Sequence, residues 1–342
     1  MSQTAALGLD VGTSRVVTAR SSGGEHGGGE YNYDSQLNAF VSIPYSKITV
    51  DALRRENVPH TVMPYEIIVH GNESEKFAGL LNAEIRRPMN RGVLDPKEPE
   101  SLKVIREILS RMLEADAQKQ EGPVRAPKKI CFTVPAPPLG VPDALTHHEA
   151  TLRQTLEELG FEPSSINEGL AVVYGELEDS NYTGIGISCG GGLCNVCLAY
   201  LSVPVLSFSV PKAGDYVDVN TAQVTGERAN LVRLAKEDSF HFNGFFENKM
   251  QQVIGVYYDD MIRSLVGSLK EAFARTSSLP KFNRPIPIML SGGTTLPAGF
   301  RDRFEKLLKE QEFPITVSEI RMARDPLHST AKGALTFALS EA

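Results

Sequence analysis

The chain repeats an arrangement of an apolar strand, a Gly-rich turn and a second strand, and this repeat limits the folds it can adopt. The pattern predicts strands over residues 5–9 and 15–19 on either side of Asp10-Val11-Gly12-Thr13-Ser14. The same order returns in the second half around Cys189-Gly190-Gly191-Gly192. A chain of 342 residues is long enough for two such units. We therefore expect two lobes related by internal duplication, with a ligand cleft between them.

Strand and helix patterns alternate along the rest of the chain, which is typical of a layered α/β fold. Buried-type strands are predicted over 129–134 and 286–290. The spacing of apolar residues predicts helices over 101–114, 146–159, 248–273, 298–308 and 329–339. In the helix over 101–114 the residues expected to face the core are Leu102, Ile105, Leu109 and Met112. The Gly-rich stretch 21–29 is expected to be a flexible hairpin tip.

Composition argues against several classes of function. The net charge is -7 and there is no run of Lys and Arg, so affinity for nucleic acid or for an anionic membrane is not expected. We find no apolar run long enough to span a bilayer, no signal segment and no amphipathic membrane anchor in the sequence. Four cysteines in so long a chain do not make a disulfide scaffold, so a reducing cytoplasm is the expected location.

The first Gly-rich turn has residues suited to a phosphate and a metal ion. Gly12 lets backbone N–H groups approach an anion, and the hydroxyls of Thr13 and Ser14 can donate to it. Asp10 would repel a phosphate and is better suited to holding a hydrated Mg²⁺, which keeps several of its waters. The alternative is a simple hairpin turn, because Asp, Gly and Thr favour turns in general.

Two further Gly-rich turns also follow apolar strands. The turn Gly190–Gly192 offers a second backbone nest for phosphate oxygens, although a hairpin with a Gly bulge has the same composition. The third turn, 291–297, contains Gly292, Gly293 and Thr294. It lies between a predicted strand and a predicted helix whose N-terminal dipole would favour an anion. Three such turns in one chain predict a nucleotide cleft.

The order of these turns resembles that of the actin, heat-shock chaperone and sugar kinase superfamily. The first two turns are similar to its phosphate motifs, 167–171 to the linker motif between them, and 291–297 to its adenosine motif. The segment Arg-Pro-Met-Asn-Arg-Gly-Val-Leu over 87–94 resembles the Arg-Pro-x-x-x-Gly-Val-Ile segment of the bacterial actins MreB and MamK. Residues 212–218 and 235–237 look closest to MamK. The resemblance covers essentially the whole chain.

This resemblance implies a two-lobed fold, each lobe a mixed sheet flanked by helices, with ATP or ADP and Mg²⁺ in the cleft. Lobe I would comprise 1–180 with a small insertion at about 35–89. Lobe II would comprise 181–324 with a small subdomain at about 212–254, and a C-terminal helix within 325–342 would return to lobe I. The resemblance also implies polymerisation into cytoplasmic filaments.

Roles for individual residues follow from the same match. Glu168 would orient the attacking water, and Asp10 would take part in catalysis by holding Mg²⁺ through water. Lys236 and Glu237 would border the adenosine. The alternatives are a helix N-terminal carboxylate for Glu168, worth ~0.5 kcal/mol, and a solvated helix face for Lys236 and Glu237.

The second phosphate motif departs from the family pattern. Ser188 stands where Asp is usual, and Leu193, Cys194 and Asn195 stand where Thr, Thr and an acid are expected. The Asp would help to place the metal and its water, whereas the Gly backbone donors remain. Gly169 in place of Pro is a milder departure. Because catalysis by positioning tolerates little misplacement, we expect nucleotide binding with slow or absent hydrolysis.

Some residues are open to a functional and a structural interpretation. Cys194 and Cys197 form a Cys-x-x-Cys pair, but residues three apart on a strand point to opposite faces, so small buried hydrophobes are favoured over a metal site. The adjacent His147 and His148 are expected on the surface near a helix start. Four phenylalanines over 240–246 fit either a core or an exposed patch.

Two functions remain open at this stage. The first is an ATP-binding filament, which the segment 87–94 favours. The second is a non-polymerising nucleotide-binding adaptor resembling PilM or FtsA, which would recruit membrane-associated or organelle-associated partners; the altered second motif leaves it open. A small-molecule kinase is less favoured because no substrate-domain insertion is evident, and a chaperone because no substrate-binding domain follows residue 342.

Overall fold

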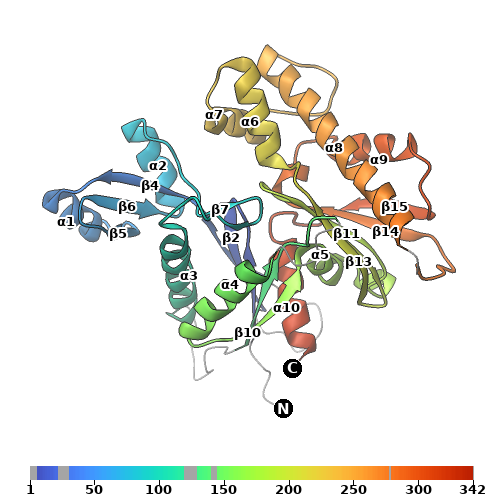
Figure 1. Ribbon diagram of the computed structural model, residues 1–342, viewed down its shortest axis with the longest axis horizontal. Coiled ribbons are helices and arrows are strands. Elements are labelled where there is room, and N and C mark those ends of the chain that lie inside the picture. Colours follow the sequence, from blue (N-terminus) through green and yellow to red (C-terminus); the bar gives the residue numbers. More distant parts are fainter. Residues whose placement is uncertain (1–5, 22–30, 119–128, 140–144, 277–278, 342) are drawn as a thin grey trace.

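The computed structural model describes residues 6–21, 31–118, 129–139, 145–276 and 279–341, and it contains two five-stranded sheets (Figure 1). The first has the order β10-β9-β1-β2-β3, with β1 (Ala6–Val11), β2 (Arg15–Ser21), β3 (Tyr31–Leu37), β9 (Lys129–Val134) and β10 (Glu162–Asn167). The second has the order β13-β12-β11-β14-β15, with β11 (Gly184–Cys189), β12 (Cys194–Tyr200), β13 (Val203–Val210), β14 (Ile286–Ser291) and β15 (Val317–Met322).

The two sheets share one topology. β1 pairs antiparallel with β2 and parallel with β9, just as β11 pairs antiparallel with β12 and parallel with β14. The outer strands also correspond. β10 and β15 pair parallel with β9 and β14, whereas β3 and β13 pair antiparallel with β2 and β12. The two predicted strand–turn–strand units are therefore confirmed, and the equivalent topology is what an internal duplication produces. The residue boundaries given above for the lobes stay predictions.

Helices cover both sheets. The first lobe carries α3 (Ser101–Gln118), α4 (Thr146–Glu158), α5 (Glu168–Glu176), the 3₁₀ turn η1 (Glu178–Ser180) and α10 (Ser329–Ser340). The second carries α6 (Gly214–Thr225), α7 (Ala229–Asp238), α8 (Lys249–Arg275), the 3₁₀ turn η2 (Gly293–Thr295) and α9 (Phe300–Lys309). Within the described ranges, no helix is both long and apolar enough to cross a bilayer.

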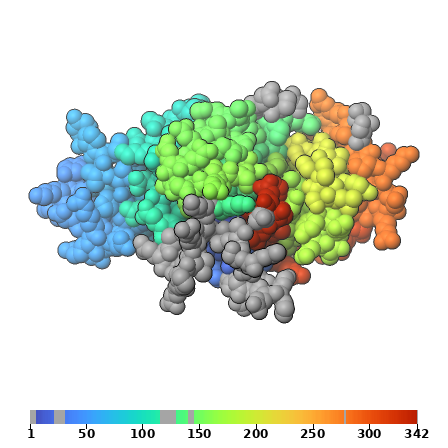
Figure 2. Space-filling view, turned by 90° about the horizontal axis from the view of Figure 1, so that it is seen from below, coloured from blue at the N-terminus to red at the C-terminus, as the bar shows by residue number. Residues whose placement is uncertain are grey.

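An insertion after β3 forms one end of the molecule. It contains a three-stranded sheet with the order β4-β6-β5 and two helices. Its elements are β4 (Phe40–Pro44), α1 (Lys47–Arg55), β5 (His60–Val62), β6 (Glu66–His70) and α2 (Asn72–Leu81), followed by the short hairpin β7 (Met89–Asn90) and β8 (Val93–Leu94). In Figure 2 this blue segment lies at the opposite end from the orange segments, with the red C-terminal helix between them.

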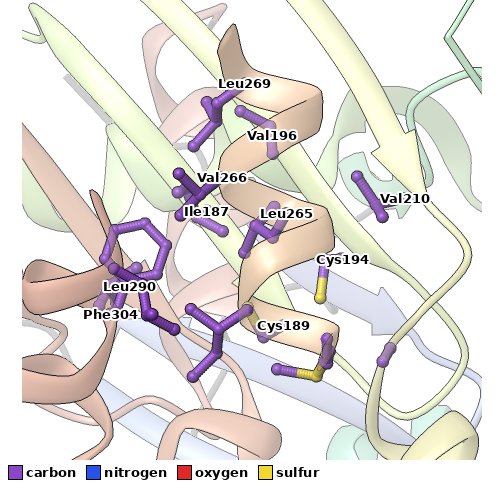
Figure 3. Close-up of a cluster of buried hydrophobic side chains, with 14 of the residues drawn as sticks. Ile187, Cys189, Cys194, Val196, Val210, Leu265, Val266, Leu269, Leu290 and Phe304 are labelled. Atoms are coloured by element: carbon purple, nitrogen blue, oxygen red, sulfur yellow. The ribbon is translucent and has the colours of Figure 1, made fainter. Parts of the chain in front are cut away.

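The largest core lies between the second sheet and α8, with α9 beside it (Figure 3). The predicted stripe of α8 is buried at Ile254, Tyr258, Met261, Leu265 and Leu269, while Met250 is half-buried at its edge. Cys189 and Cys194 belong to this core, whereas Cys197 belongs to the core between the two sheets. The Cys-x-x-Cys pair thus points to opposite faces as expected, and all four cysteines are buried free thiols.

Two residues on helices differ from the prediction. Leu102 is 46% exposed, and the inward face of α3 is instead continued by Ile108 and Leu113. His148 is buried rather than on the surface, because the backbone N–H of Leu94 donates to its Nδ1 at 3.3 Å. Burial lowers the pKa of His148 to about 4. Of the expected hairpin tip at 21–29, Ser21 is described, and residues 22–29 lie outside the described residues.

At several glycines the helices α5 and α10 and the strands β1 and β11 approach so closely that there is no room for a side chain. A Cβ on Gly333 of α10 would come within 1.7 Å of the carbonyl oxygen of Ala171 in α5. A Cβ on Gly8 of β1 would lie 2.1 Å from the carbonyl oxygen of Ala331. On the other side of α5, a Cβ on Gly186 of β11 would lie 2.2 Å from the carbonyl oxygen of Gly169. Glycine is therefore required at these helix–helix and helix–sheet contacts.

We expect Gly333→Ala to destabilise the fold by about 1–3 kcal/mol or more, because the added methyl group has to displace the backbone of α5. The measurement is the free energy of unfolding in urea. Gly267→Ala in α8 is the matched control, since its Cβ would meet no atom within 4 Å. That control should be neutral or stabilising by up to ~1 kcal/mol from helix propensity. Equal effects of the two substitutions would contradict the close approach.

Candidate functional site

A cavity of about 390 Å³ lies where the three Gly-rich turns meet. This volume is within the range of about 300–1,000 Å³ that is common for small-molecule sites. Both sheets supply its lining. The predicted site residues that line it are Asp10, Gly12, Thr13, Ser14, Glu168, Gly190, Gly191, Gly192, Lys236, Glu237, Gly292, Gly293 and Thr294. Every residue singled out for a nucleotide site therefore lies on one cavity.

The first turn is a hairpin that keeps unpaired donors. The N–H of Gly12 donates to the carbonyl of Arg15 at 2.9 Å, and the Asn38 side chain donates to the carbonyl of Gly12 at 2.8 Å. The Gly12 amide therefore holds the turn rather than facing an anion. In the described residues, the amides of Thr13 and Ser14 have no hydrogen-bond partner. The hydroxyl oxygen of Thr13 accepts from the N–H of Gly92 at 2.9 Å.

The second turn is built in the same way and faces the first. The N–H of Gly190 donates to the carbonyl of Leu193 at 2.9 Å, which closes the β11–β12 hairpin. The amides of Gly191 and Gly192 have no partner among the described residues. A Cβ on Gly191 would lie 2.2 Å from Ser14 Oγ. The two turns therefore lie against each other, and each carries two amides that have no partner among the described residues.

The third turn supports the second. Gly292 has φ +95, and a Cβ there would lie 2.2 Å from the carbonyl oxygen of Cys189, so only glycine fits. The Thr294 hydroxyl donates to the carbonyl of Gly190 at 2.7 Å. The turn continues into η2, and α9 begins only at Phe300. The predicted helix over 298–308 is present, and it starts two residues later than predicted because η2 comes first.

Two carboxylates lie buried beside these turns. Asn167 caps the start of α5 by accepting from the N–H of Gly169 at 2.9 Å, which places Glu168 in its first turn. Glu168 Oε2 accepts from Ser188 Oγ at 3.2 Å and from Asn195 Nδ2 at 2.9 Å. Burial, and next the charge of Asp10, raise the pKa of Glu168 to about 8. Glu168 is therefore a buried acid, not an exposed helix N-terminal carboxylate.

Asp10 is held by hydroxyl groups from two distant parts of the chain. Its Oδ1 accepts from Thr133 Oγ1 at 2.5 Å and its Oδ2 from Thr330 Oγ1 at 2.6 Å. Burial raises the pKa of Asp10, while these two hydrogen bonds oppose the shift. Two neighbouring carboxyl groups with raised pKa values favour a proton or a cation between them. Carboxylate and hydroxyl oxygens are a donor set that suits Mg²⁺, which needs few carboxylates because it retains water.

Lys236 does not lie on a solvated helix face. Its Nζ donates to Asp218 Oδ2 at 2.8 Å and to the carbonyl of Gly214 at 3.2 Å, and both members of the ion pair are buried. Glu237 is half-exposed and pairs with Arg233 at 3.1 Å. Across the described ranges, no cluster of three or more His, Cys, Asp or Glu side chains could hold a metal alone.

The phenylalanines over 240–246 divide between core and surface. Phe240 is buried and stacks on Tyr258, with ring centroids 5.3 Å apart, and it lines the cavity. Phe242 and Phe246 are partly buried beside the same core, whereas Phe245 is 70% exposed. Phe240 and Tyr258 therefore give the cavity an aromatic part of its lining.

A family model described as Volactin matches residues 5–338. The chain belongs to the Volactin family. No curated protein matches the sequence of this Volactin-family protein. The family match covers nearly the whole length of the chain, so it includes both lobes and the cavity between them.

Solved structures of low identity show what the fold is. The chain is similar to a MamK double helical filament, with TM-score 0.71, 20% identity and 98% of each chain covered. It is also similar to MreB5 of Spiroplasma citri bound to ADP, with TM-score 0.66, 13% identity, and 97% of this chain and 95% of that chain covered. EutJ, an ethanolamine utilization protein of Carboxydothermus hydrogenoformans, matches with TM-score 0.56 and 13% identity. The match covers 98% of this chain and 89% of that chain. The predicted two-lobed actin-like fold is confirmed.

Three side-chain contacts cross the mouth of the cleft in this Volactin-family protein. Arg87 beside the insertion pairs with Asp215 of α6 at 2.6 Å. Arg233 of α7 pairs with Glu75 of α2, and Arg228 donates to Asn82 at 2.9 Å. Sequence reasoning did not find these contacts, because the partners are 128 or more residues apart and no local pattern links them.

We expect the contribution of Glu168 to the stability of the Volactin-family protein, without metal or nucleotide, to fall as pH rises from about 5 to about 8.5. The folded Glu168 keeps a proton up to about pH 8, whereas an unperturbed glutamate, whose pKa is 4.5, has lost it in the unfolded chain. Glu168→Gln cannot titrate, so its free energy of unfolding should rise relative to wild type across this range. Urea denaturation at several pH values measures the difference.

Glu176→Gln is the control for that experiment, because Glu176 is a buried acid paired with Lys332 away from the cavity. Its difference from wild type should not show the same rise toward alkaline pH. A constant difference between wild type and Glu168→Gln at every pH would contradict the raised pKa of Glu168.

Proposed function

We propose that the chain binds ATP or ADP with Mg²⁺ in the cavity between its two sheets. The observation that carries this proposal is the set of four unpaired amides, those of Thr13, Ser14, Gly191 and Gly192, at the facing turns. Backbone N–H groups arranged in this way bind phosphate oxygens. The non-polymerising MamK mutant bound to AMPPNP and MreB5 bound to ADP have similar folds, which supports a nucleotide as the ligand.

Different residues would bind the phosphates and the metal ion. The unpaired amides and the hydroxyl of Ser14 would donate to phosphate oxygens. Asp10 and Glu168 would hold the hydrated Mg²⁺, whose charge offsets that of the phosphates. Glu168 would also orient a water, and the hydrogen bonds from Ser188 and Asn195 that hold its Oε2 support this role. We propose that hydrolysis is slow, since Ser188 supplies a hydroxyl where an acid would help to position the metal and its water.

We further propose that the protein assembles into filaments in the cytoplasm with nucleotide bound. A relative of similar fold, MamK, forms a double helical filament. The insertion carries large apolar side chains on its surface, including Ile48 at 83%, Tyr65 at 90% and Leu80 at 81% exposure. Such exposed apolar groups are typical of surfaces that associate with another chain. The alternative is a non-polymerising adaptor with the same nucleotide site.

We expect wild type to bind Mg·ADP and Gly192→Ala to bind it at least about tenfold more weakly, measured by titration calorimetry. A Cβ on Gly192 would lie 2.5 Å from Thr13 Oγ1 and 2.9 Å from the amide nitrogen of Gly92, so the facing turns would have to separate. Gly79→Ala in α2 is the matched control because its Cβ would meet nothing within 4 Å. Equal affinities for all three proteins would argue against a phosphate site at the turns.

We expect wild type to sediment as filaments with Mg·ATP, visible by negative-stain microscopy, and to release phosphate slowly. The Gly192→Ala variant should lose the nucleotide dependence of sedimentation, because its facing turns no longer bind phosphate. Absence of polymer across salt and magnesium conditions, with Mg·ATP still bound, would favour the adaptor. Steady-state phosphate release as fast as that of active bacterial actins would contradict the role given to Ser188.

A further inference from the structure

Arg15 is a half-buried cation on the wall of the cavity. It directly follows Ser14, at the start of β2, and it lines the cavity. Its guanidinium makes no hydrogen bond or ion pair with any residue that the structure describes. None of its nitrogen atoms is enclosed by the protein, so a ligand can reach them. The guanidinium therefore keeps its donors and its charge available.

The alternation of side chains along β2 directs Arg15 toward the cavity. Arg15 and Val17 both line it, whereas Val16 and Thr18 do not. Val17 belongs to the core between the two sheets, while Val16 belongs to the core on the other face of the first sheet, beside α3. Residues two apart on a strand share a face. Arg15 therefore lies on the face of β2 that is turned toward the second lobe, where the cavity is.

The other Lys and Arg side chains that line the cavity are already paired. Arg233 is engaged by two glutamates, and Lys236 is engaged by an aspartate. Asp10 and Glu168 accept from hydroxyl and amide groups of the protein and form no ion pair with Arg15. Among the described residues of the cavity wall, Arg15 is thus the one Lys or Arg without an anionic partner.

We propose that Arg15 binds the phosphate groups of the nucleotide and adds a cationic contact to the backbone amides of the two facing turns; this inference rests on the proposed nucleotide function. The phosphates are the anionic part of a nucleotide, and a guanidinium can donate to two phosphate oxygens at once. Arg15 adjoins Ser14, whose amide has no partner among the described residues. Because Asp10 and Glu168 line the same cavity, a cation there also offsets their repulsion of the phosphates.

The test compares the affinities of wild type, Arg15→Met and Arg15→Lys for Mg·ADP and for adenosine, by titration calorimetry and displacement. We expect Arg15→Met to bind Mg·ADP about tenfold or more weakly, because hydrogen bonds between charged groups are lost, while its affinity for adenosine stays nearly unchanged. Arg15→Lys keeps the charge without the planar fork and should lie between the two. Arg284→Met is the matched control, since Arg284 is exposed and does not line the cavity. This control should bind Mg·ADP as wild type does.

A second measurement needs no variant and decides the matter even if Arg15→Met does not fold. Phenylglyoxal reacts with accessible guanidinium groups, and peptide mass spectrometry identifies the modified arginines. In wild type we expect Arg15 to be modified without ligand and to be protected by saturating Mg·ADP. Adenosine should leave it open to modification. Arg284 should react equally under all three conditions.

The outcomes separate this contact from the nucleotide function itself. A wild type that does not bind Mg·ADP overturns both. If wild type binds Mg·ADP but Arg15 stays open to modification, or if Arg15→Met binds it as tightly, the role of Arg15 is wrong while the nucleotide function stands. Equal weakening by Arg15→Met and Arg284→Met would reflect net charge alone and overturn the contact. Equal losses for Mg·ADP and adenosine, or protection by adenosine, would place Arg15 against the nucleoside and overturn the phosphate assignment.

Discussion

The arrangement of the molecule depends on the close packing of helix α5 between the two sheets. On one side α10 approaches so closely that a Cβ on Gly333 would lie 1.7 Å from the carbonyl oxygen of Ala171. On the other side a Cβ on Gly169 would lie 2.6 Å from the amide nitrogen of Cys197 in β12. Packing at this density resists any change in the spacing of the layers. Because β1 and β11 are both fixed by this packing, the turns that follow them are brought face to face.

The position of Glu168 follows from the same contact. Gly169, the residue after it, has no room for a side chain against β12, so this packing requires glycine where the resembling actin-superfamily motif has proline. Once α5 lies this close to β12, Glu168 reaches Asn195 on that strand at 2.9 Å. Asn195 Oδ1 in turn accepts from the N–H of Ala136, in the loop after β9, at 2.8 Å. One amide side chain thus connects Glu168 to both sheets.

Local patterns in the sequence were sufficient for the elements and for the turns. Apolar stripes predicted α8, and Gly-rich segments after apolar strands predicted the three turns that line the cavity, whereas Glu168, Lys236 and Glu237 were predicted through the resemblance to known motifs. Contacts between distant residues could not be predicted, because no periodicity links Asp10 to Thr330, 320 positions away. His148 was misplaced for a related reason, since its burial depends on the hairpin of β7 and β8.

The replacement of an acid by Ser188 has two opposite effects in this setting. The charge of Asp10 already adds to the raised pKa of Glu168, and a third carboxylate at 188 would lie against Glu168 Oε2, where the Ser188 hydroxyl now donates at 3.2 Å. A hydroxyl relieves that crowding and fixes the orientation of Glu168. It cannot, however, draw a metal toward the second turn as a carboxylate would. The amides that would bind phosphate are backbone groups and are unaffected by the change. If the chain binds a nucleotide as proposed, such a site would favour holding it over hydrolysing it.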